Sequence, residues 1–222
     1  MTGYRWDFAS VFANADILLR GALGTLQLAV VGFGAGLVLG LALGAARVST
    51  RRLLNWPATA FVELFRNTPA LVQIMWFFYA FPILIGVQIG AFAAASLALS
   101  LNTAAFCAEI FRGGIQSITR GQWEAGRALG MTYPMLMRRV ILPQAVKRMI
   151  PAFTNRGLEL AKMTSLASTI AVAELLYEGR LLSSITYRPI ETYTTVAVLY
   201  FVLLQAGALA VDRLEARLRK AD

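Results

Sequence analysis

The sequence predicts an all-α, polytopic membrane protein with about five transmembrane helices and a basic cytoplasmic loop, because each span needs ~20 apolar residues. Two observations carry this prediction. Of the 222 residues, 58% are hydrophobic and 15% are charged, whereas a soluble domain has roughly 25% charged residues. Long stretches without any charge also occur, at 21–46, 67–108 and 192–211. We therefore expect a single transmembrane domain over 1–222, with no length left for a soluble catalytic domain.

The rare residue types exclude several classes of function. The chain has no histidine and a single cysteine, Cys107, so the commonest metal ligand and general base are missing and no internal disulfide can form. Cys107 lies among apolar residues and is expected to be a small buried hydrophobe. The net charge of +9 could suggest nucleic acid, but in so apolar a chain the distribution of charge matters more than its sum. We expect no metal site and no nucleic-acid partner.

The first span is predicted at residues 19–47, within the first charge-free stretch. Residues 6–19, which precede it, mix aromatic with acidic side chains and do not resemble a cleavable signal. They form either an interfacial helix on the outer face or a plain leader into the span. Glycines recur at every fourth position of the span, which favours close packing against a neighbouring helix: Gly32, Gly36, Gly40 and Gly44.

The second and third spans share the charge-free stretch at 67–108, which exceeds the length of one helix. One proline and two glycines interrupt it, at Pro82, Gly86 and Gly90. We therefore expect a short turn near Pro82 that joins spans at 57–81 and 88–112.

The fourth span is less regular than the others. Its apolar part at 163–173 is short, and Glu174 and Glu178 follow. A charge at the centre of a lipid-facing helix costs ~2.5–3.5 kcal/mol on insertion scales. We therefore expect a short or broken helix at 151–178 that is shielded by its neighbours. The fifth span is predicted at 190–212.

The distribution of basic residues sets the orientation. With an odd number of spans the two termini lie on opposite sides, and most basic residues gather on one of them: Arg47, Arg51 and Arg52, the region 112–162, and Arg213, Arg217, Arg219 and Lys220. The other side holds Arg5, Arg20, Arg180 and Arg188. Because basic residues accumulate on cytoplasmic loops, the N-terminus is expected outside and the C-terminus in the cytoplasm. A four-span arrangement would mix the two sets.

The cytoplasmic loop at 113–150 is expected to form two short helices, parallel to the membrane and joined by a tight turn. Glu124 and Ala125 open a run of helix formers, and Glu124 near a helix start is favoured by the helix dipole. Gly130 suits the left-handed residue that ends many helices. Pro134 fits the first turn of the second helix, and Pro143 closes or kinks it. Such a rigid hairpin can insert into a cleft of a soluble partner.

The residues of this loop also carry a family resemblance. Glu124-Ala125-Gly126, followed by Gly130 and by Val140-Ile141-Leu142-Pro143, resembles the signature loop of binding-protein-dependent ABC import permeases. The family pattern has alanine where Gly126 stands and isoleucine where Val140 stands, so the departures are small. Segments at 63–69, 108–118 and 162–166 resemble the polar amino acid branch, which includes importers for glutamate, glutamine, arginine and histidine. That branch often has an acidic residue where Met163 stands.

The resemblance implies partners in a bacterial inner membrane. A pair of ATP-binding subunits would dock on the loop, a second permease subunit (identical or paralogous) would complete the path, and an extracytoplasmic substrate-binding protein would deliver a polar amino acid. The chain has no Gly-x-x-x-x-Gly-Lys-Ser/Thr run to hold nucleotide phosphates. We therefore expect no cofactor and no enzyme activity in this chain, with ATP and Mg²⁺ on the partner ATPase. The residues expected to couple the two are Glu124, Ala125, Gly126, Gly130, Leu142 and Pro143.

Two groups of residues are candidates for the substrate path. Asn102, Phe106 and Glu109 share one face of the third span, where an amide, a ring and a carboxylate could meet an amino group; alternatively, Glu109 pairs with Arg112 one turn away. Thr164 and Ser165 lie where the fourth span begins or breaks. Free backbone amides and hydroxyls there could bind a carboxylate, or the hydroxyls could bond back to the preceding turn.

Two other classes of function compete with this interpretation. A stand-alone secondary transporter would need its own coupling-ion site, which Glu109 and Glu174 could supply, but it leaves the cytoplasmic hairpin unexplained. A membrane enzyme fits less well, because the sequence contains no recognisable nucleophile–base or metal constellation.

Overall fold

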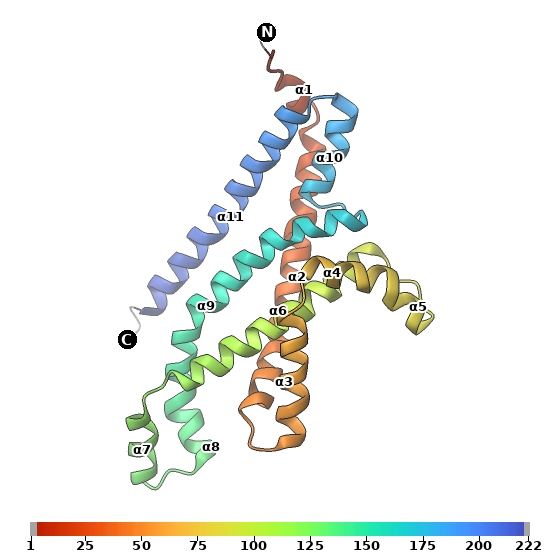
Figure 1. The fold of residues 1–222 in the computed structure, drawn as a ribbon. Helices are drawn as coiled ribbons and strands as arrows, with labels where there is room; N and C mark the ends of the chain where they lie inside the picture. Colours follow the sequence, from red (N-terminus) through yellow and green to blue (C-terminus); the bar gives the residue numbers. More distant parts are fainter. Residues whose placement is uncertain (1–3, 220–222) are drawn as a thin grey trace.

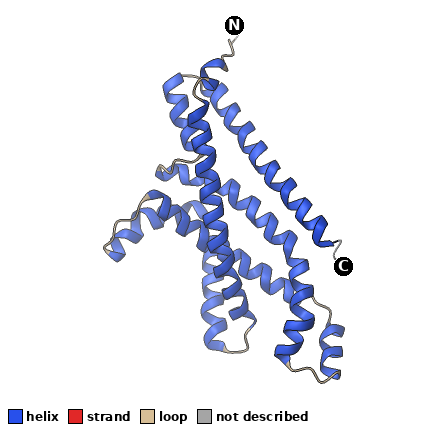
Figure 2. Cartoon of the chain, turned by 180° about the vertical axis from the view of Figure 1, so that it is seen from behind, coloured by secondary structure: helices blue, strands red, loops and turns tan. Residues whose placement is uncertain are grey.

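The computed structural model describes residues 4–219, and this part of the chain contains helices and no strand (Figure 2). The predicted all-α fold is confirmed. The helices are α1 (Ala9–Phe12), α2 (Ala15–Val48), α3 (Arg52–Arg66), α4 (Ala70–Met75), α5 (Phe81–Ile85), α6 (Ala91–Gln116), α7 (Arg120–Ala128), α8 (Tyr133–Leu136), α9 (Leu142–Met163), α10 (Leu175–Thr186) and α11 (Pro189–Arg219). Two π-helical turns, at Trp76–Ala80 and Met137–Ile141, and a 3₁₀ helix at Thr164–Ile170 complete the series.

The helices form an elongated molecule around α2 (Figure 1). In that view α2 descends from the N-terminal end, and α3 returns along its lower part. The bent α4–α5 segment projects to the right, and α6 leads from it across α2 to the lower end, where α7 and α8 form a hairpin. α9 leads back from the hairpin to the middle, α10 continues to the N-terminal end, and α11 descends again.

The contact between α2 and α6 is the centre of the fold. A Cβ atom added to Gly36 would lie 2.7 Å from Cβ of Thr103, and one added to Gly44 would lie 2.8 Å from Cβ of Phe111. Between them, Gly40 stands equally close to the buried Cys107. Because ordinary side chains do not approach this closely, the glycine stripe lets the two backbones pack together. The predicted seam is confirmed.

The second predicted span is bent and is not a single helix. α3 ends at Arg66, the next helical segment begins at Ala70, and their directions differ by 103°. Pro69 causes the bend: it caps α4 with an extended backbone, and a proline disfavours helical geometry in the residue before it. The side-chain amide of Gln73 stabilises the bend, because its Nε2 donates hydrogen bonds to the carbonyl oxygens of Phe65 (2.9 Å) and Thr68 (3.0 Å).

The turn before the third span forms close to its predicted place. Gly86, with φ +68°, ends α5 in the left-handed region, which glycine adopts without steric cost. Pro82 lies in the first turn of α5 and does not break the chain direction. The helix that follows covers Ala91–Gln116, whereas the span was placed at 88–112.

The fourth pass is a broken helix, as expected, but its limits differ. α9 begins at Leu142 and not at 151, and a 3₁₀ helix and an irregular link separate it from α10. Glu174 is fully buried in this link. Its carboxylate accepts hydrogen bonds from the backbone N–H groups of Leu176 and Tyr177 and from the hydroxyl of Tyr200. These donors satisfy the buried charge that a lipid-facing helix would leave exposed.

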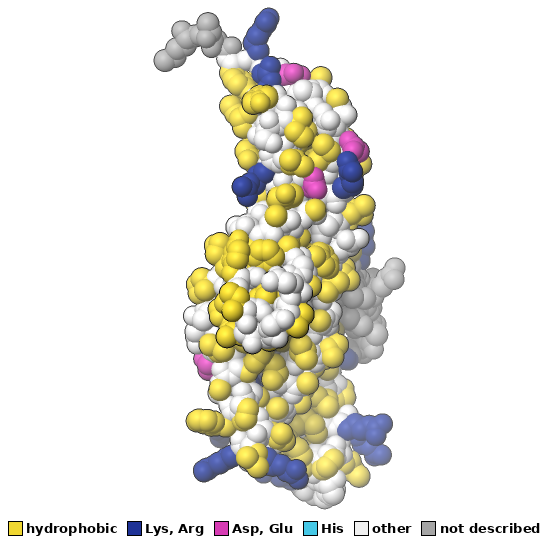
Figure 3. All heavy atoms as spheres, turned by 90° about the vertical axis from the view of Figure 1, so that its right-hand side faces the viewer, with side chains coloured by type: hydrophobic (Ala, Val, Ile, Leu, Met, Phe, Trp, Pro, Cys, Tyr) yellow, Lys and Arg dark blue, Asp and Glu magenta, His cyan; other side chains and the backbone are white. Residues whose placement is uncertain are grey.

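Three of the described helices are long and apolar enough to cross a membrane: α2, α6 and the part of α11 at Pro189–Val211. The bent pair formed by α3 and the 70–85 segment adds a fourth if it counts as one span. α9 fails such a test because charged residues, including Arg156, Glu159 and Lys162, interrupt it. Figure 3 shows apolar side chains over the middle of one face, with Lys and Arg side chains towards both ends.

Candidate functional site

The hairpin at the lower end has the turn geometry that the sequence predicts. α7 ends at Ala128, and Gly130 takes the left-handed conformation with φ +72°. The N–H of Met131 then donates to the carbonyl of Gly126 (3.1 Å), and the N–H of Gly130 to that of Arg127 (2.9 Å). This pair of bonds closes a helix C-terminus with a sharp reversal of the chain. Pro134 lies in the first turn of α8, as expected.

One local prediction about the hairpin is wrong. α7 begins at Arg120, so Glu124 lies in the second turn and not at the helix start. Of the two alternatives for Pro143, an end or a kink of the second helix, the end does not occur, because α9 continues to Met163. The π-helical turn at Met137–Ile141 precedes the proline and accommodates the extra residue without ending the helix. The second arm of the hairpin is therefore one long helical rod, from α8 through α9.

The hairpin has its own hydrophobic core, which makes it rigid. The rings of Trp123 and Tyr133 stack with centroids 6.3 Å apart. Gly126 packs directly against the side chain of buried Leu136, so the glycine at this family position fits a close contact between the two arms. The buried residues of this core are Ile115, Ile118, Leu136, Ile141, Ala145 and Met149.

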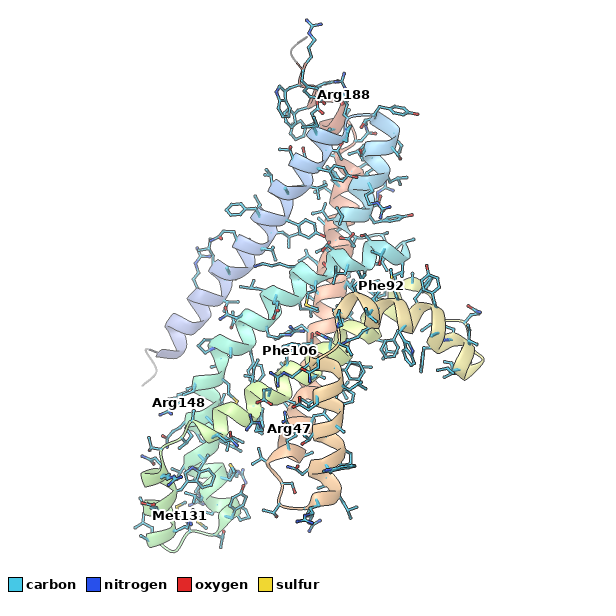
Figure 4. The ribbon with its side chains drawn as sticks, viewed as in Figure 1. Arg47, Phe92, Phe106, Met131, Arg148 and Arg188 are labelled. Carbon is cyan, nitrogen blue, oxygen red and sulfur yellow. The ribbon has the colours of Figure 1, made fainter. Side chains whose placement is uncertain are left out.

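The predicted coupling residues occupy different environments on this hairpin. Glu124, Ala125 and Gly130 are exposed, as is Pro143, whereas Gly126 is buried and Leu142 is half-buried. The exposed members are free to meet another protein, and the buried ones hold the two arms together. Figure 4 places Met131 near the tip of this element, at the lower end of the molecule.

A second candidate site is a polar cluster in the middle of the fold, centred on Asn102. The amide nitrogen of Asn102 donates to the carbonyl of Phe65 and to Oε1 of Gln73, both at 3.1 Å. Its Oδ1 accepts from Nη2 of Arg156 at 2.6 Å. Asn102 is 3% exposed. One side chain of α6 thus connects the bend after α3, the start of α4 and the middle of α9.

Arg156 and Glu159 belong to this cluster and were missed in the sequence analysis. Arg156 is 3% exposed, lies 4.1 Å above the ring centroid of Phe106, and donates to Glu159 at 2.8 Å. Its Nε atom has no hydrogen-bond partner. The side chain of Glu159, by contrast, is 57% exposed. An Arg and a Glu one turn apart in a predicted span were the signal, since charges inside a membrane segment mark functional positions.

Glu109 lies in a separate, ionic cluster nearer the lower end. It forms ion pairs with Arg47 of α2 and Arg112 of α6, and its Oε2 lies 3.6 Å from Nη1 of Arg66 in α3. The predicted pairing with Arg112 therefore occurs, within a larger network that joins three helices. Phe106 lies between the two clusters (Figure 4). The guanidinium carbon of Arg66 lies 5.6 Å from the centroid of the Phe106 ring, and that of Arg156 lies 4.1 Å from it.

Thr164 and Ser165 lie at the start of the 3₁₀ helix, where the fourth pass breaks as expected. Their hydroxyls donate to the carbonyls of Ala161 (2.9 Å) and Lys162 (2.8 Å). Of the two alternatives for these hydroxyls, the structure therefore contains hydrogen bonds back to the preceding helical turn. Thr164 is fully buried and Ser165 half-buried. Among the side chains that the structure describes, no group of three or more Asp, Glu, Cys or His residues could hold a metal ion.

Comparison with known proteins yields one family. Residues 36–220 match the family described as "Binding-protein-dependent transport system inner membrane component". The chain is 37% identical over 211 residues to the probable glutamine ABC transporter permease protein GlnM of Bacillus subtilis (strain 168), covering 95% of this chain and 97% of that protein. It is 36% identical over 216 residues to the glutamine transport system permease protein GlnP of Escherichia coli (strain K12), covering 97% and 99%.

The solved structures give the same result. The structure described as "Crystal structure of an amino acid ABC transporter with histidines" contains a chain that superposes with a TM-score of 0.91. The two are 34% identical, and the match covers 96% of this chain and 100% of that one. An inward-facing form of the MetNI methionine ABC transporter superposes with a TM-score of 0.78 at 27% identity, over 92% and 97% of the two chains.

Proposed function

The chain belongs to the family of binding-protein-dependent transport system inner membrane components, and on that premise we propose that it imports a polar amino acid as one of two permease subunits. It is a transmembrane permease subunit of an ABC importer, and ATP hydrolysis belongs to a separate subunit. The relatives named above, which match almost from end to end, are named for amino acids or for glutamine, which supports this class of cargo.

The observation that carries the proposal is the exposed, self-packed hairpin α7–α8. It presents Glu124, Ala125 and Gly130 to solvent on an element with its own core. We place a pair of ATP-binding subunits, with ATP and Mg²⁺, against this surface. A rigid hairpin is suited to this role, because a movement of the ATP-binding subunits would displace the hairpin as a whole and would not merely bend it.

The continuous helical segment from α8 through α9 connects the hairpin to the proposed substrate path. From Pro143 to Arg156 the helix rises by about 20 Å, at 1.5 Å per residue. Arg156 contacts Asn102 on α6, so a movement of the rod changes the polar cluster directly. The two states that result need only differ in their affinity for nucleotide and for cargo.

The polar cluster is our candidate for the substrate path. Asn102 and Arg156 are buried, and the carboxylate of Glu159 emerges beside them on a face of α9 that this chain leaves exposed. An exposed carboxylate at membrane depth is favourable only against water or another subunit. A second permease subunit, identical or paralogous, would therefore face Glu159 across the path. The ammonium and carboxylate groups of an amino acid complement Glu159 and Arg156 in charge.

The other predicted path residues have supporting roles in this proposal. Thr164 and Ser165 lie a little more than two turns beyond Arg156 along the chain and can offer hydroxyls to the cargo once their hydrogen bonds to the preceding turn open. Glu109 closes the cytoplasmic end of the path through its arginine network. In the proposed orientation the N-terminus faces an extracytoplasmic substrate-binding protein, and the hairpin and C-terminus lie in the cytoplasm.

The alternative of a stand-alone secondary transporter gains no support from the geometry. Its two candidate ion-binding carboxylates already have fixed donors: Glu109 pairs with arginines, and Glu174 accepts two backbone hydrogen bonds. Neither carboxylate remains available for a coupling ion without breaking this arrangement.

Reconstitution tests the proposed function. The chain is purified together with its copurifying subunits and inserted into proteoliposomes, and uptake of labelled glutamine, arginine, histidine and glutamate is measured. We expect uptake only with ATP, the ATPase subunits and the external binding protein. Uptake by the chain alone under a sodium or proton gradient would contradict the proposal and favour the secondary transporter.

A further inference from the structure

Helix α3 has one face that packs against the protein and one whose apolar side chains are exposed in the described part of the chain. Ala58 and Val62 are buried, at 4% and 0% exposure, and the side chain of Asn55 donates to the carbonyl of Arg47 at 2.5 Å. On the opposite face, Leu53 is 90%, Trp56 78% and Leu64 60% exposed. The spacing of these three residues puts them in a single stripe along the helix.

The stripe ends in two exposed arginines at the α2–α3 turn. Arg51 and Arg52 have exposed side chains, and neither forms an ion pair within the described part of the chain. Arg52, Leu53, Trp56 and Pro57 line a shallow cavity of about 370 Å³. Cationic and apolar groups thus adjoin in one open depression.

We propose that this surface binds an anionic phospholipid of the cytoplasmic leaflet, with the headgroup at Arg51 and Arg52 and an acyl chain along the stripe. The inference rests on the orientation given under the proposed function. Guanidinium groups donate paired hydrogen bonds to phosphate, tryptophan favours the membrane–water interface, and unpaired basic residues there attract anionic headgroups.

The length of the apolar stripe on α3 agrees with the thickness of one lipid leaflet. From Leu53 to Leu64 the stripe measures about 16 Å at 1.5 Å per residue. One leaflet contributes about half of the ~30 Å hydrocarbon core. A stripe that begins beside two exposed arginines and runs for one leaflet thickness matches a single phospholipid molecule.

Fluorescence of Trp56 tests this site in the assembled transporter. Phenylalanine replaces Trp6, Trp76 and Trp123, so that Trp56 is the only tryptophan left in this chain, and the complex is placed in nanodiscs; the same complex with Trp56→Phe gives the signal of the other subunits, which is subtracted. Brominated phosphatidylglycerol and brominated phosphatidylcholine are compared at equal mole fraction. We expect the anionic lipid to quench Trp56 at least twofold more strongly, and we expect 0.5 M salt to reduce that difference because salt screens exposed charges.

Two variants separate the proposed site from a general attraction of basic surfaces. Arg51→Gln with Arg52→Gln should abolish the preference for phosphatidylglycerol. Arg138→Gln with Arg139→Gln, an exposed basic pair on the hairpin, should leave it intact. Both pairs of substitutions are at exposed positions and replace a charged side chain by a shorter, neutral polar one, so folding should be preserved.

Two results would overturn the inference. Equal quenching by the two lipids would mean that the stripe lies in lipid without headgroup selectivity. Absence of quenching by either lipid, with Trp56 shielded from aqueous acrylamide, would mean that another subunit covers the surface. ATP-dependent uptake measured in proteoliposomes of the same preparation tests the proposed function separately, since normal uptake with either result would leave that function standing.

Discussion

Nη2 of Arg156 lies 2.6 Å from Oδ1 of Asn102, and this bond joins the rod that starts in the exposed hairpin to the central helix of the fold. Arg156 is on α9 and Asn102 on α6, so the two residues link the element that we propose meets the ATPase to the element that we propose lines the path. The same asparagine holds the corner between α3 and α4 through Phe65 and Gln73. Movement of the hairpin therefore reaches several helices through one side chain.

Asn102→Ala should weaken both stability and transport. The change leaves the buried groups of Arg156 and Gln73 short of partners, which costs about 1–3 kcal/mol. We expect a lower melting temperature of the detergent-solubilised complex and a loss of ATP-driven uptake. Ser96→Ala is the matched control, because the buried Ser96 hydroxyl on the same helix has no partner and its removal should not lower stability. Equal effects of the two substitutions would contradict this role of Asn102.

Gly40→Ala should disrupt the contact between α2 and α6. The added methyl group would meet Cys107 and the backbone of Ala104, and overpacking of this kind costs about 1–3 kcal/mol. Reduced yield of folded protein and a lower melting temperature are expected. Gly34→Ala, on the same helix with open space around it, should behave as wild type. A stable Gly40→Ala protein would show that the seam is looser than described.

Glu109→Gln tests whether Glu109 stabilises the fold or binds the substrate. Loss of the carboxylate leaves Arg47, Arg66 and Arg112 close together without their shared partner, at a cost of about 1–3 kcal/mol. We expect lower stability and a lower maximal rate of uptake, with KM for the cargo nearly unchanged. Glu63→Gln, whose side chain is half exposed, should have little effect. A large rise in KM with unchanged stability would instead assign Glu109 to the substrate.

Several features of the fold and the hairpin could be predicted because they depend on local or periodic constraints. Gly130 and Pro134 have backbone preferences that hold in any context, so the turn formed where expected. The glycine stripe of α2 specifies a face at which another helix must approach. Charge-free length likewise identifies apolar helices without knowledge of packing, while the orientation inferred from the basic residues stays a prediction.

The features that escaped prediction depend on contacts between distant residues. The corner at Pro69 requires Gln73 and Asn102 to satisfy the freed carbonyls, and these partners come from different helices. Arg156 is stabilised in the interior by Phe106 and Asn102 on α6, which no local pattern reveals. The continuation of the second hairpin arm past Pro143 relies on the π-helical turn before it, whereas the local rule for proline favours a stop.

Coupling through the hairpin is the central claim, and parallel measurement of binding-protein-stimulated ATP hydrolysis and amino acid uptake tests it most directly. Gly130→Asp places a side chain at φ +72° on the exposed tip, and Glu124→Lys reverses an exposed charge. Gly86→Asp is the matched control, because Gly86 also has positive φ and open surroundings but lies in the α5–α6 turn. In proteoliposomes, the two hairpin variants should remain inserted and lose binding-protein-stimulated ATP hydrolysis and uptake together, by tenfold or more, while Gly86→Asp retains both. Normal uptake with an unchanged ATP-to-cargo ratio in both hairpin variants would contradict the account.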